Sequence, residues 1–313
     1  MARTIIALAS LLLGLASRAA AGDLERCALR HGGLERTYYL RAPAAPTPTA
    51  GARPLVICLH GGHGKATANP GLTRRGFERL ADRDGFLICY PDAVEGNWND
   101  GRGVADYTAH RDGVDDVGFI AALIDALVRG RGADPRRVYV TGISNGAMMA
   151  NRLGLELASK VAAIAPVAGS IPVAIAPSAT AVPSATAVPV LMISGDADPL
   201  VPYDGGDVHF YRRKLGQVLS VPAAARLWAA RDGCSPAPAT DRLPDRDPDD
   251  GTRVRRERWT GGAAEVTLLT VEGGGHTWPG GLQYLPALVI GKTTRDIDAC
   301  NEIWRFFRAH ARP

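Results

Sequence analysis

A serine flanked by glycines is the first feature of chemical interest in the chain, in the pentapeptide Gly142-Ile143-Ser144-Asn145-Gly146. An apolar run (138–141) precedes this pentapeptide and a helical pattern (147–157) follows it. This strand–turn–helix order is that of a nucleophile elbow, a sharp turn that holds a serine hydroxyl clear of the sheet. The N-terminus of the following helix favours negative charge that develops beside the serine. We therefore predict that Ser144 is a nucleophile.

A serine hydroxyl needs a base to remove its proton, and His276 is the candidate base. It follows three glycines (273–275), which come directly after the last predicted strand (266–271). Such a flexible segment allows the chain to pass over the sheet edge and present the imidazole ring. Four other histidines lie in polar or terminal segments and are expected at the surface; they are His31, His110, His209 and His310.

The imidazole in turn needs a carboxylate that fixes its tautomer and stabilises its protonated form. Asp196 and Asp198 both follow the predicted strand at 190–194. Asp198 is preferred, because Asp196 lies nearer the strand end and is suited to capping the turn. The chain order Ser144, Asp198, His276 is that of α/β-hydrolases, and it differs from the orders of chymotrypsin and subtilisin.

Two backbone N–H groups are expected to stabilise the oxyanion of a tetrahedral intermediate. One belongs to Asn145, directly after the predicted nucleophile. The other is expected in the loop after the predicted strand 55–59, which reads His-Gly-Gly-His-Gly at 60–64. Gly62 is the first choice for this donor and His63 the alternative, whereas His60 is expected to hold the loop.

The sequence excludes two other interpretations of this loop, a phosphate-binding loop and a zinc site. In a phosphate-binding loop the Gly-Lys pair at 64–65 would be followed by Ser or Thr, but Ala66 stands there. A zinc site at His60 and His63 lacks a third ligand at a suitable spacing. We therefore expect no metal and no organic cofactor.

Six short runs rich in Val, Ile and Leu supply the elements that must position these residues. Each run ends in a turn rich in Gly or Asp, which is typical of strands buried on both faces of a parallel sheet. The runs are 55–59, 86–90, 138–141, 162–167, 190–193 and 266–271, and 36–41 is expected as an antiparallel addition. Helical patterns lie between them, so the predicted fold class is α/β, a single domain with a mostly parallel central sheet flanked by helices.

Two further helices, besides the helical pattern at 147–157, are predicted from apolar stripes with helical spacing. The first (117–127) follows the Asp115-Asp116 pair, and one of these aspartates is expected to cap it while the pair anchors the loop. The last (297–307) is expected to open at Thr294 or Asp296. These boundaries rest on the preference of Asp and Thr for the N-cap position.

Length and charge limit the classes of protein that fit the chain. The 313 residues suit one large α/β domain. The 36 basic and 32 acidic residues give a net charge of +4, which is too small to indicate nucleic-acid binding. A segment with a duplicated Pro-Ser-Ala-Thr-Ala-Val (177–189) and a polar segment (235–258) are predicted surface excursions, and neither separates two domains.

The first residues (1–21) have the pattern of a secretory signal peptide. Arg3 supplies a positive charge, 5–16 is apolar, and Ala19–Ala21 precede Gly22 as a cleavage site. The apolar run is shorter than the roughly 20 residues that a membrane-spanning helix needs. We therefore expect a catalytic domain at 22–313, secreted or periplasmic and not bound to a membrane.

The chain contains five cysteines, and an exported protein is permitted disulfides. Cys58 and Cys89 lie within predicted central strands and are expected to be buried thiols. Cys234 follows a predicted helix and Cys300 lies on the last helix, and this pair is the candidate disulfide. Cys27 has no obvious partner, and none of the five is a candidate nucleophile.

Several motifs together resemble those of a known family. They are His60-Gly61-Gly62, 98–102 (WNDGR), 114–119 (VDDVGF), 142–149 (GISNGAMM), 198–203 (DPLVPY) and 275–280 (GHTWPG). Together, over residues 35–310, they are similar to the polyhydroxybutyrate depolymerase and feruloyl esterase group, also called carbohydrate esterase family one. The resemblance implies an α/β-hydrolase fold and a Ser–His–Asp carboxylic ester hydrolase without a cofactor. It also supports Asp198, because the family's acid directly precedes this proline.

The resemblance leaves several ester substrates open, namely feruloyl esters of polysaccharides, acetyl groups on xylan and aliphatic polyesters. The Ser-Asn-Gly elbow and the Trp-Pro-Gly after His276 look more like the feruloyl esterase side. Trp278 and Trp98 are expected to stack on an acyl group or sugar, unless they only pack their loops, and His63 is a further candidate for substrate contact.

Depolymerases that act on crystalline polyester usually carry a linker and a polymer-binding domain. The chain ends at Pro313 with neither, which favours soluble or polysaccharide-borne esters. The expected partner is therefore a small-molecule or polymer-borne ester, and the oligomeric state stays open. A catalytically silent carbohydrate-binding protein is the remote alternative, against which the complete triad argues.

Overall fold

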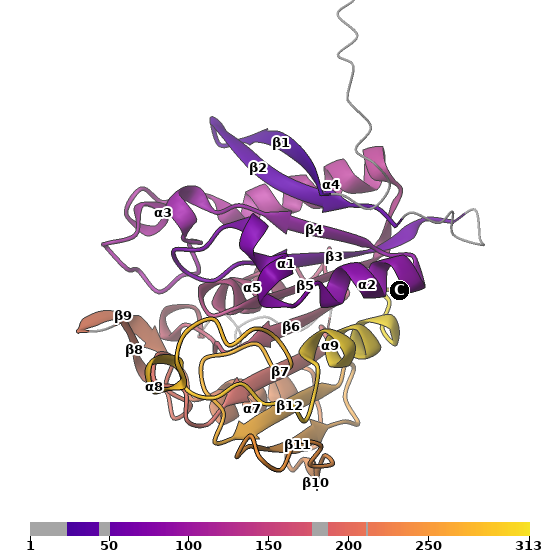
Figure 1. Ribbon diagram of the computed structural model, residues 1–313. Coiled ribbons are helices and arrows are strands. Elements are labelled where there is room, and N and C mark those ends of the chain that lie inside the picture. Colours follow the sequence, from indigo (N-terminus) through magenta and orange to yellow (C-terminus); the bar gives the residue numbers. More distant parts are fainter. Residues whose placement is uncertain (1–23, 44–50, 177–186, 211) are drawn as a thin grey trace, which may run out of the picture.

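A computed structural model describes residues 24–43, 51–176, 187–210 and 212–313 (Figure 1). The predicted signal peptide (1–21) and most of the duplicated segment (177–186) lie outside these described residues. None of the helices in the described part of the chain is both long and apolar enough to cross a bilayer.

Within the described ranges, ten strands form one sheet. They are β1 (Glu25–His31), β2 (Leu34–Arg41), β3 (Arg53–Leu59), β4 (Leu87–Pro91), β5 (Ala133–Ile143), β6 (Ala163–Val167), β7 (Val190–Gly195), β10 (Ala239–Arg242), β11 (Arg253–Trp259) and β12 (Val266–Glu272). Their order is β1-β2-β4-β3-β5-β6-β7-β12-β11-β10. The six strands from β4 to β12 pair in parallel, and the strands at both edges are antiparallel. The predicted α/β class with a mostly parallel sheet is confirmed, and 36–41 is part of the antiparallel β2.

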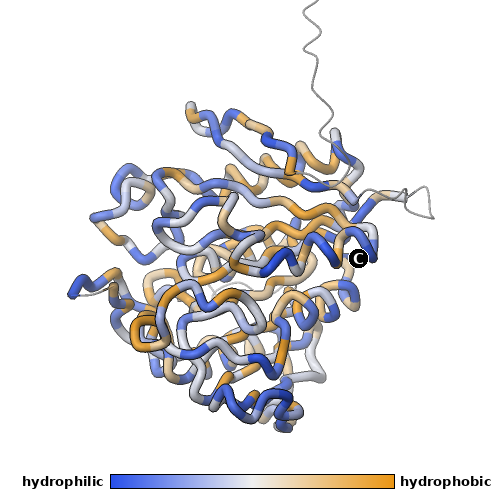
Figure 2. Tube along the Cα trace, in the orientation of Figure 1, coloured by the Kyte–Doolittle hydropathy of each residue, from blue (hydrophilic) through white to orange (hydrophobic). Residues whose placement is uncertain are grey.

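Helices cover both faces of the sheet (Figure 1). One apolar core contains Phe119, Met149 and Trp228, and a second core on the other face contains Phe77 and Phe307. Figure 2 shows that hydrophobic residues follow the central strands, whereas the region of β10 and β11 is largely hydrophilic. The helices are α1 (Asn69–Leu72), α2 (Gly76–Asp84), α3 (Thr108–Arg111), α4 (Asp116–Arg131), α5 (Asn145–Glu156), α7 (Val221–Arg231), α8 (Ala287–Ile290) and α9 (Ala299–Arg308).

The two predicted helix caps have different outcomes. Asp115 caps α4, because its carboxylate accepts the Gly118 N–H at 2.8 Å. The last helix begins later than predicted, and its cap is Asp298, whose side chain accepts the Asn301 N–H at 2.9 Å. Asp296 cannot open this helix, because its carboxylate accepts backbone N–H groups at 246 and 247 instead.

The polar segment 235–258 is only partly a surface excursion, because it contains β10 and most of β11. Asp241 and Arg256 lie directly opposite one another on these two strands, and their side chains form an ion pair. Charged pairs of this kind can stabilise two strands at the edge of a sheet even when their sequences do not alternate between apolar and polar residues. The sequence pattern therefore gave no strand signal here.

The predicted disulfide between Cys234 and Cys300 is wrong, and all five cysteines are free thiols. The two residues pack against the cores on opposite faces of the sheet. Cys234 donates its thiol to the Ala264 carbonyl at 3.0 Å. Cys300 faces α2, where a side chain at Gly76 would lie 2.7 Å from its sulfur. Helical spacing alone could not say which face of the sheet each cysteine reaches.

A buried carboxyl group at the end of α7 makes stability depend on pH. Asp232 is 3% exposed, and burial raises its pKa to about 7, although the neighbouring Arg231 partly opposes this shift. The unfolded chain has the lower, ordinary pKa. The folded protein therefore loses stability as the pH rises between the two values, and the loss is complete above the folded-state pKa.

We expect Asp232→Asn to raise the free energy of unfolding by about 1–3 kcal/mol more at pH 8 than at pH 5. The amide carries no charge at either pH, so it avoids the cost of a buried carboxylate. Urea unfolding at both pH values measures the difference. The exposed Asp249→Asn is the control, and equal effects of Asp232→Asn at both pH values would contradict the prediction.

Candidate active site

Ser144 lies in the tight turn between β5 and α5. Its backbone has φ 58° and ψ −121°, a conformation that side chains rarely adopt. The flanking glycines leave no room for a side chain. A Cβ at Gly142 would lie 2.7 Å from the Gly146 carbonyl oxygen, and a Cβ at Gly146 would lie 2.5 Å from the His60 carbonyl oxygen. The local backbone is therefore that of a nucleophile elbow.

His276 and Asp198 form a buried pair beside this turn. The distance from His276 Nδ1 to Asp198 Oδ2 is 2.7 Å, and the side chains are 4% and 2% exposed. The other carboxylate oxygen, Oδ1, accepts the N–H groups of Leu200 and Val201 at 2.8 and 2.9 Å. A carboxylate can only accept, so His276 donates its Nδ1 proton and its Nε2 is left to accept one.

Neighbouring groups fix the loop that carries the histidine. Asp196 accepts the Gly273 N–H at 2.7 Å and so anchors the start of this loop. The His276 N–H donates to the Ile290 carbonyl at 2.6 Å, and its carbonyl accepts the Tyr284 hydroxyl at 3.0 Å. Of the two aspartates left open by the sequence, Asp198 contacts the imidazole, whereas Asp196 holds the turn.

The loop at 60–64 lies against the serine turn. A Cβ at Gly61 would come within 3.4 Å of Ser144 Cβ. The His63 N–H already donates to Asn97 Oδ1 at 3.1 Å. The Gly62 N–H bonds to no other residue in the part of the chain that the structure describes. This difference favours Gly62 over His63 as the oxyanion donor of the loop.

The His60 side chain fixes the loop at 60–64 through two hydrogen bonds. Its Nε2 accepts the Ala93 N–H at 3.1 Å, so its Nδ1 carries the proton and donates to the Gly61 carbonyl at 2.8 Å. Burial lowers the pKa of His60 and so favours this neutral form. Across the described ranges, no group of three or more His, Cys, Asp or Glu side chains is placed to hold a metal ion.

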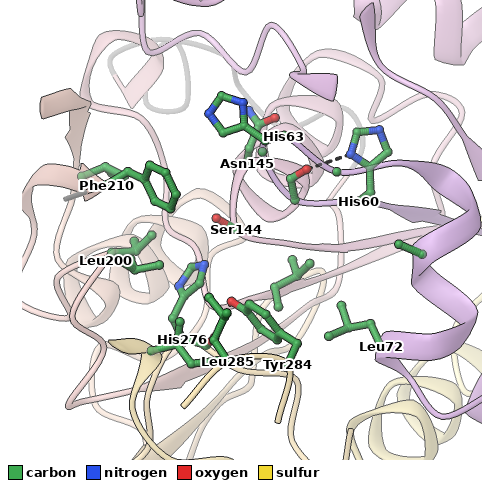
Figure 3. A pocket seen from close by; sticks show the side chains of 18 of the residues that line it. His60, His63, Leu72, Ser144, Asn145, Leu200, Phe210, His276, Tyr284 and Leu285 are labelled. Atoms are coloured by element: carbon green, nitrogen blue, oxygen red, sulfur yellow. Dashed lines mark hydrogen bonds between the residues drawn. The ribbon is translucent and has the colours of Figure 1, made fainter. Parts of the chain in front are cut away.

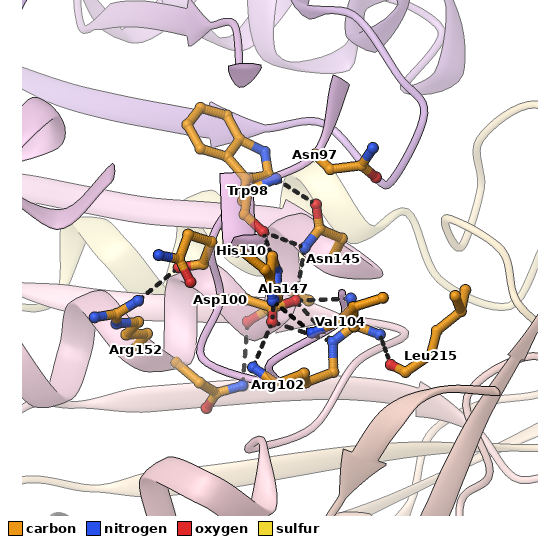
Figure 4. Close-up of polar contacts among 12 residues, drawn as sticks. Asn97, Trp98, Asp100, Arg102, Val104, His110, Asn145, Ala147, Arg152 and Leu215 are labelled. Atoms are coloured by element: carbon orange, nitrogen blue, oxygen red, sulfur yellow. Dashed lines mark hydrogen bonds and ion pairs between the residues drawn. The ribbon is translucent and has the colours of Figure 1, made fainter. Parts of the chain in front are cut away.

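The Asn145 side chain fixes the first residue of α5 (Figure 4). Its Oδ1 accepts the Trp98 N–H at 2.8 Å. Its Nδ2 donates to the Trp98 carbonyl at 3.0 Å and to Asp100 Oδ2 at 2.6 Å. All these atoms are buried, so the side chain holds the backbone of Asn145 in one position beside Ser144.

The two tryptophans predicted to contact substrate do not line the pocket, so that prediction is wrong. Trp98 is 0% exposed and Trp278 is 1% exposed. The indole N–H of Trp98 donates to the His60 carbonyl at 3.0 Å. Trp278 packs edge-on against Phe77, with ring centroids 6.0 Å apart. Both indole rings are therefore parts of the packed interior.

A pocket of about 590 Å³ contains Ser144, His276 and Gly62 (Figure 3). His63, predicted to contact substrate, lines it and packs edge-on against Tyr107. His209, predicted to lie at the surface, is half-buried and also lines the pocket. Most other walls are apolar, and they include Leu72, Tyr107, Ile143, Leu200, Val201, Val208, Phe210, Leu215, Leu282, Tyr284, Leu285, Val289 and Ile290.

An uncharged segment (282–289) forms an exposed apolar rim at this pocket. Leu288 is 97% exposed, and Leu282, Tyr284, Leu285 and Val289 are each at least 38% exposed. Phe210, from the separate hairpin of β8 (Gly206–Phe210) and β9 (Arg213–Val218), is also exposed and lines the pocket. This rim was not predicted from the sequence, although the apolar run LQYLPALV (282–289) directly after the histidine loop is a visible signal.

His110 is also placed differently from the prediction of a surface histidine. Its side chain is only 2% exposed. Its Nδ1 accepts the Val104 N–H at 2.9 Å, so Nε2 carries the proton and donates to the Trp98 carbonyl at 2.9 Å. His110 therefore fixes the same Trp98 backbone that binds the Asn145 side chain.

Comparisons with known proteins give the following matches. A family model described as "Esterase PHB depolymerase" matches residues 37–205. "Putative esterase NocK" of Nocardia uniformis subsp. tsuyamanensis is 35% identical over 290 residues, which cover 86% of this chain and 78% of that protein. "Feruloyl esterase B" of Piromyces equi is 28% identical over 72% of this chain and 40% of its own length. A solved thermostable esterase has the same fold, with a TM-score of 0.58 and 15% identity over 94% of this chain and 64% of its own.

Proposed function

The chain belongs to the PHB depolymerase family of esterases, and from this premise we propose that it is a serine carboxylic ester hydrolase with Ser144, His276 and Asp198 as its triad. The observation that carries the proposal is the buried pair of His276 and Asp198, in which His276 lines the same pocket as Ser144. The imidazole Nε2, left without a proton by this pairing, is suited to accept the serine proton.

The reaction has two stages. Ser144 attacks the ester carbonyl while His276 accepts its proton, and the N–H groups of Gly62 and Asn145 stabilise the oxyanion. His276 then gives the proton to the leaving alcohol, and an acyl-enzyme forms. In the second stage His276 takes a proton from water, which attacks the acyl-enzyme. His276 then gives that proton to the Ser144 oxygen as the acid leaves, which restores the free enzyme. Asp198 stabilises the imidazolium at each stage.

The first candidate substrate is a hydroxycinnamoyl ester. Three aromatic side chains, Tyr107, Phe210 and Tyr284, line the pocket, and they offer flat apolar surfaces to an aromatic acyl group. They take the role expected of the two tryptophans. The similarity to a feruloyl esterase supports this choice.

The second candidate substrate is an aliphatic polyester. The exposed apolar rim at 282–289 is continuous with the pocket. Exposed apolar patches next to a site are typical of surfaces that contact another apolar surface. The family name supports this alternative.

We expect kcat/KM for methyl ferulate to exceed that for acetylated xylan by at least about tenfold, because a small acetyl group leaves the apolar pocket unfilled. Rates on methyl ferulate, acetylated xylan and amorphous polyhydroxybutyrate, measured side by side, test this order. Ser144→Ala supplies the background rate. Faster release of soluble hydroxy acids from the polyester would select the second candidate instead.

Export of a single catalytic domain is part of the same proposal. It is supported by the signal-peptide pattern at 1–21, which leaves 22–313 as the catalytic domain. N-terminal sequencing of protein recovered outside the cytoplasm is expected to begin at Gly22. An N-terminus at Met1 in that material would contradict this part of the proposal.

A further inference from the structure

Asp100 and Arg102 form a buried ion pair next to the side chain of Asn145, the predicted oxyanion donor (Figure 4). Asp100 is 0% exposed, and Arg102 is 9% exposed. Arg102 Nε lies 2.9 Å and Nη2 2.8 Å from Asp100 Oδ2. The same oxygen accepts the Asn145 Nδ2 at 2.6 Å. One end of the Arg102 guanidinium is therefore connected, through a single carboxylate, to the first residue of α5.

The other end of the same guanidinium binds the β8–β9 hairpin. Arg102 Nη1 donates to the Leu215 carbonyl of β9 at 2.8 Å. The next residue, Gly216, has φ 77°, and a Cβ there would lie 2.8 Å from Arg102 Cβ. The hairpin therefore approaches Arg102 closely because residue 216 has no side chain.

This hairpin is a wall of the pocket but not part of the main sheet. Val208, Phe210 and Leu215 from its two strands line the pocket. Val208 and Leu215 also pack in a small apolar cluster with Met148 of α5. This cluster and Arg102 help to hold the wall relative to the serine turn. Backbone hydrogen bonds such as that from the His209 N–H to the Leu200 carbonyl, and an exposed ion pair between Arg213 and Asp106, also contribute.

We propose that Arg102 is a positioning residue that sets the hairpin wall of the pocket relative to the Asn145 oxyanion donor, and that it thereby determines which sizes of acyl group the enzyme accepts. This inference rests on the proposed function. The planar guanidinium of Arg102 uses separate N–H groups to bind the Asp100 carboxylate and the Leu215 carbonyl at the same time. A lysine ammonium keeps the charge but cannot make both sets of bonds with the same geometry.

The experiment compares Arg102→Lys and Gly216→Ala with the wild type on p-nitrophenyl acetate, butyrate, hexanoate and octanoate. Active sites are counted with a fluorophosphonate, so that misfolded enzyme does not enter the rates. In both variants we expect the ratio of kcat/KM for octanoate to that for acetate to fall by about tenfold. Most of the fall is expected in KM, because the wall contacts the acyl chain and not the reacting atoms.

Gly206→Ala is the matched control on the same hairpin. Gly206 also has a positive φ (101°), but a Cβ there meets no atom within 4 Å. It therefore introduces similar backbone strain without displacing Arg102, and the octanoate-to-acetate ratio is expected to stay at the wild-type value. Gly216→Ala removes no buried charge. It therefore tests the inference by itself if Arg102→Lys does not fold.

An unchanged ratio in the correctly folded variants would overturn the inference, and so would an equal fall for all four esters. An equal fall in kcat/KM for all four esters would mean that Arg102 helps only to position the Asn145 oxyanion donor and does not affect the choice of acyl group. Failure of the proposed function looks different, because the wild type would then neither react with the fluorophosphonate at Ser144 nor hydrolyse any of the esters.

Discussion

Ser144→Ala is expected to lower kcat for short p-nitrophenyl esters by at least about 10,000-fold, because no other group can form the acyl-enzyme. The fold is expected to survive. Alanine keeps the Cβ of the turn, and the backbone hydrogen bond from residue 144 to the Val167 carbonyl does not involve the hydroxyl. Labelling by a fluorophosphonate is expected to be lost as well. Steady-state rates, labelling and thermal unfolding measure these three consequences.

Ser159→Ala is the matched control for this variant. Ser159 is exposed, in the turn after α5, so its loss is expected to leave both the rate and the labelling unchanged. If Ser144→Ala keeps more than a few per cent of the activity, or if a fluorophosphonate labels it as well as the wild type, the nucleophile is a different residue.

The parallel core of the sheet could be predicted from the sequence because both faces of its strands are buried. β3, β4 and β6 are nearly continuous apolar runs, and such runs are visible without any knowledge of their neighbours. The edge strands gave no such signal. β10 has no apolar residue after Ala239, and its pairing with β11 depends on a partner strand that local sequence does not identify.

The serine turn, the histidine loop and the oxyanion loop were predicted together because glycine marks each of them. Close approach of two backbones excludes a side chain at Gly142 and Gly146. This constraint is visible in the sequence, because only glycine fits there. The residues that line the pocket carry no comparable mark. Phe210 and Leu285 come from segments far apart in the chain, and only the fold brings them to one hollow.

The error over the tryptophans has a related cause. Trp278 stands two residues after His276 in the sequence, and Trp98 lies in one of the motifs of the resemblance, but position along a loop does not tell on which side a large ring lies. Each indole is buried against the core, where its apolar area contributes more to stability than it would in an open pocket. Large aromatic residues near a site are therefore weaker predictors of substrate contact than small residues at a turn.

We expect Asp198→Asn to lower kcat by about 10,000-fold while the protein still folds, which is the size of loss seen when this position of a triad becomes an amide. The reason lies in the two N–H groups of Leu200 and Val201 that donate to Oδ1. An asparagine must place its carbonyl oxygen there, so its NH₂ group takes the place of Oδ2 and faces His276 Nδ1. The imidazole then accepts at Nδ1, carries its proton on Nε2 and cannot take the proton of Ser144.

Asp196→Asn separates this effect from a general loss of loop structure. Asp196 also follows β7 and accepts a single backbone N–H, from Gly273, and an asparagine oxygen accepts that bond equally well. We therefore expect Asp196→Asn to keep kcat within about threefold of the wild type, since a neutral acceptor replaces a charged one at some cost. Steady-state rates of the two variants, corrected for active-site concentration, give the comparison. A larger loss for Asp196→Asn than for Asp198→Asn would make Asp196 the acid of the triad, and a loss below about tenfold for both would mean that His276 needs no carboxylate to hold its tautomer.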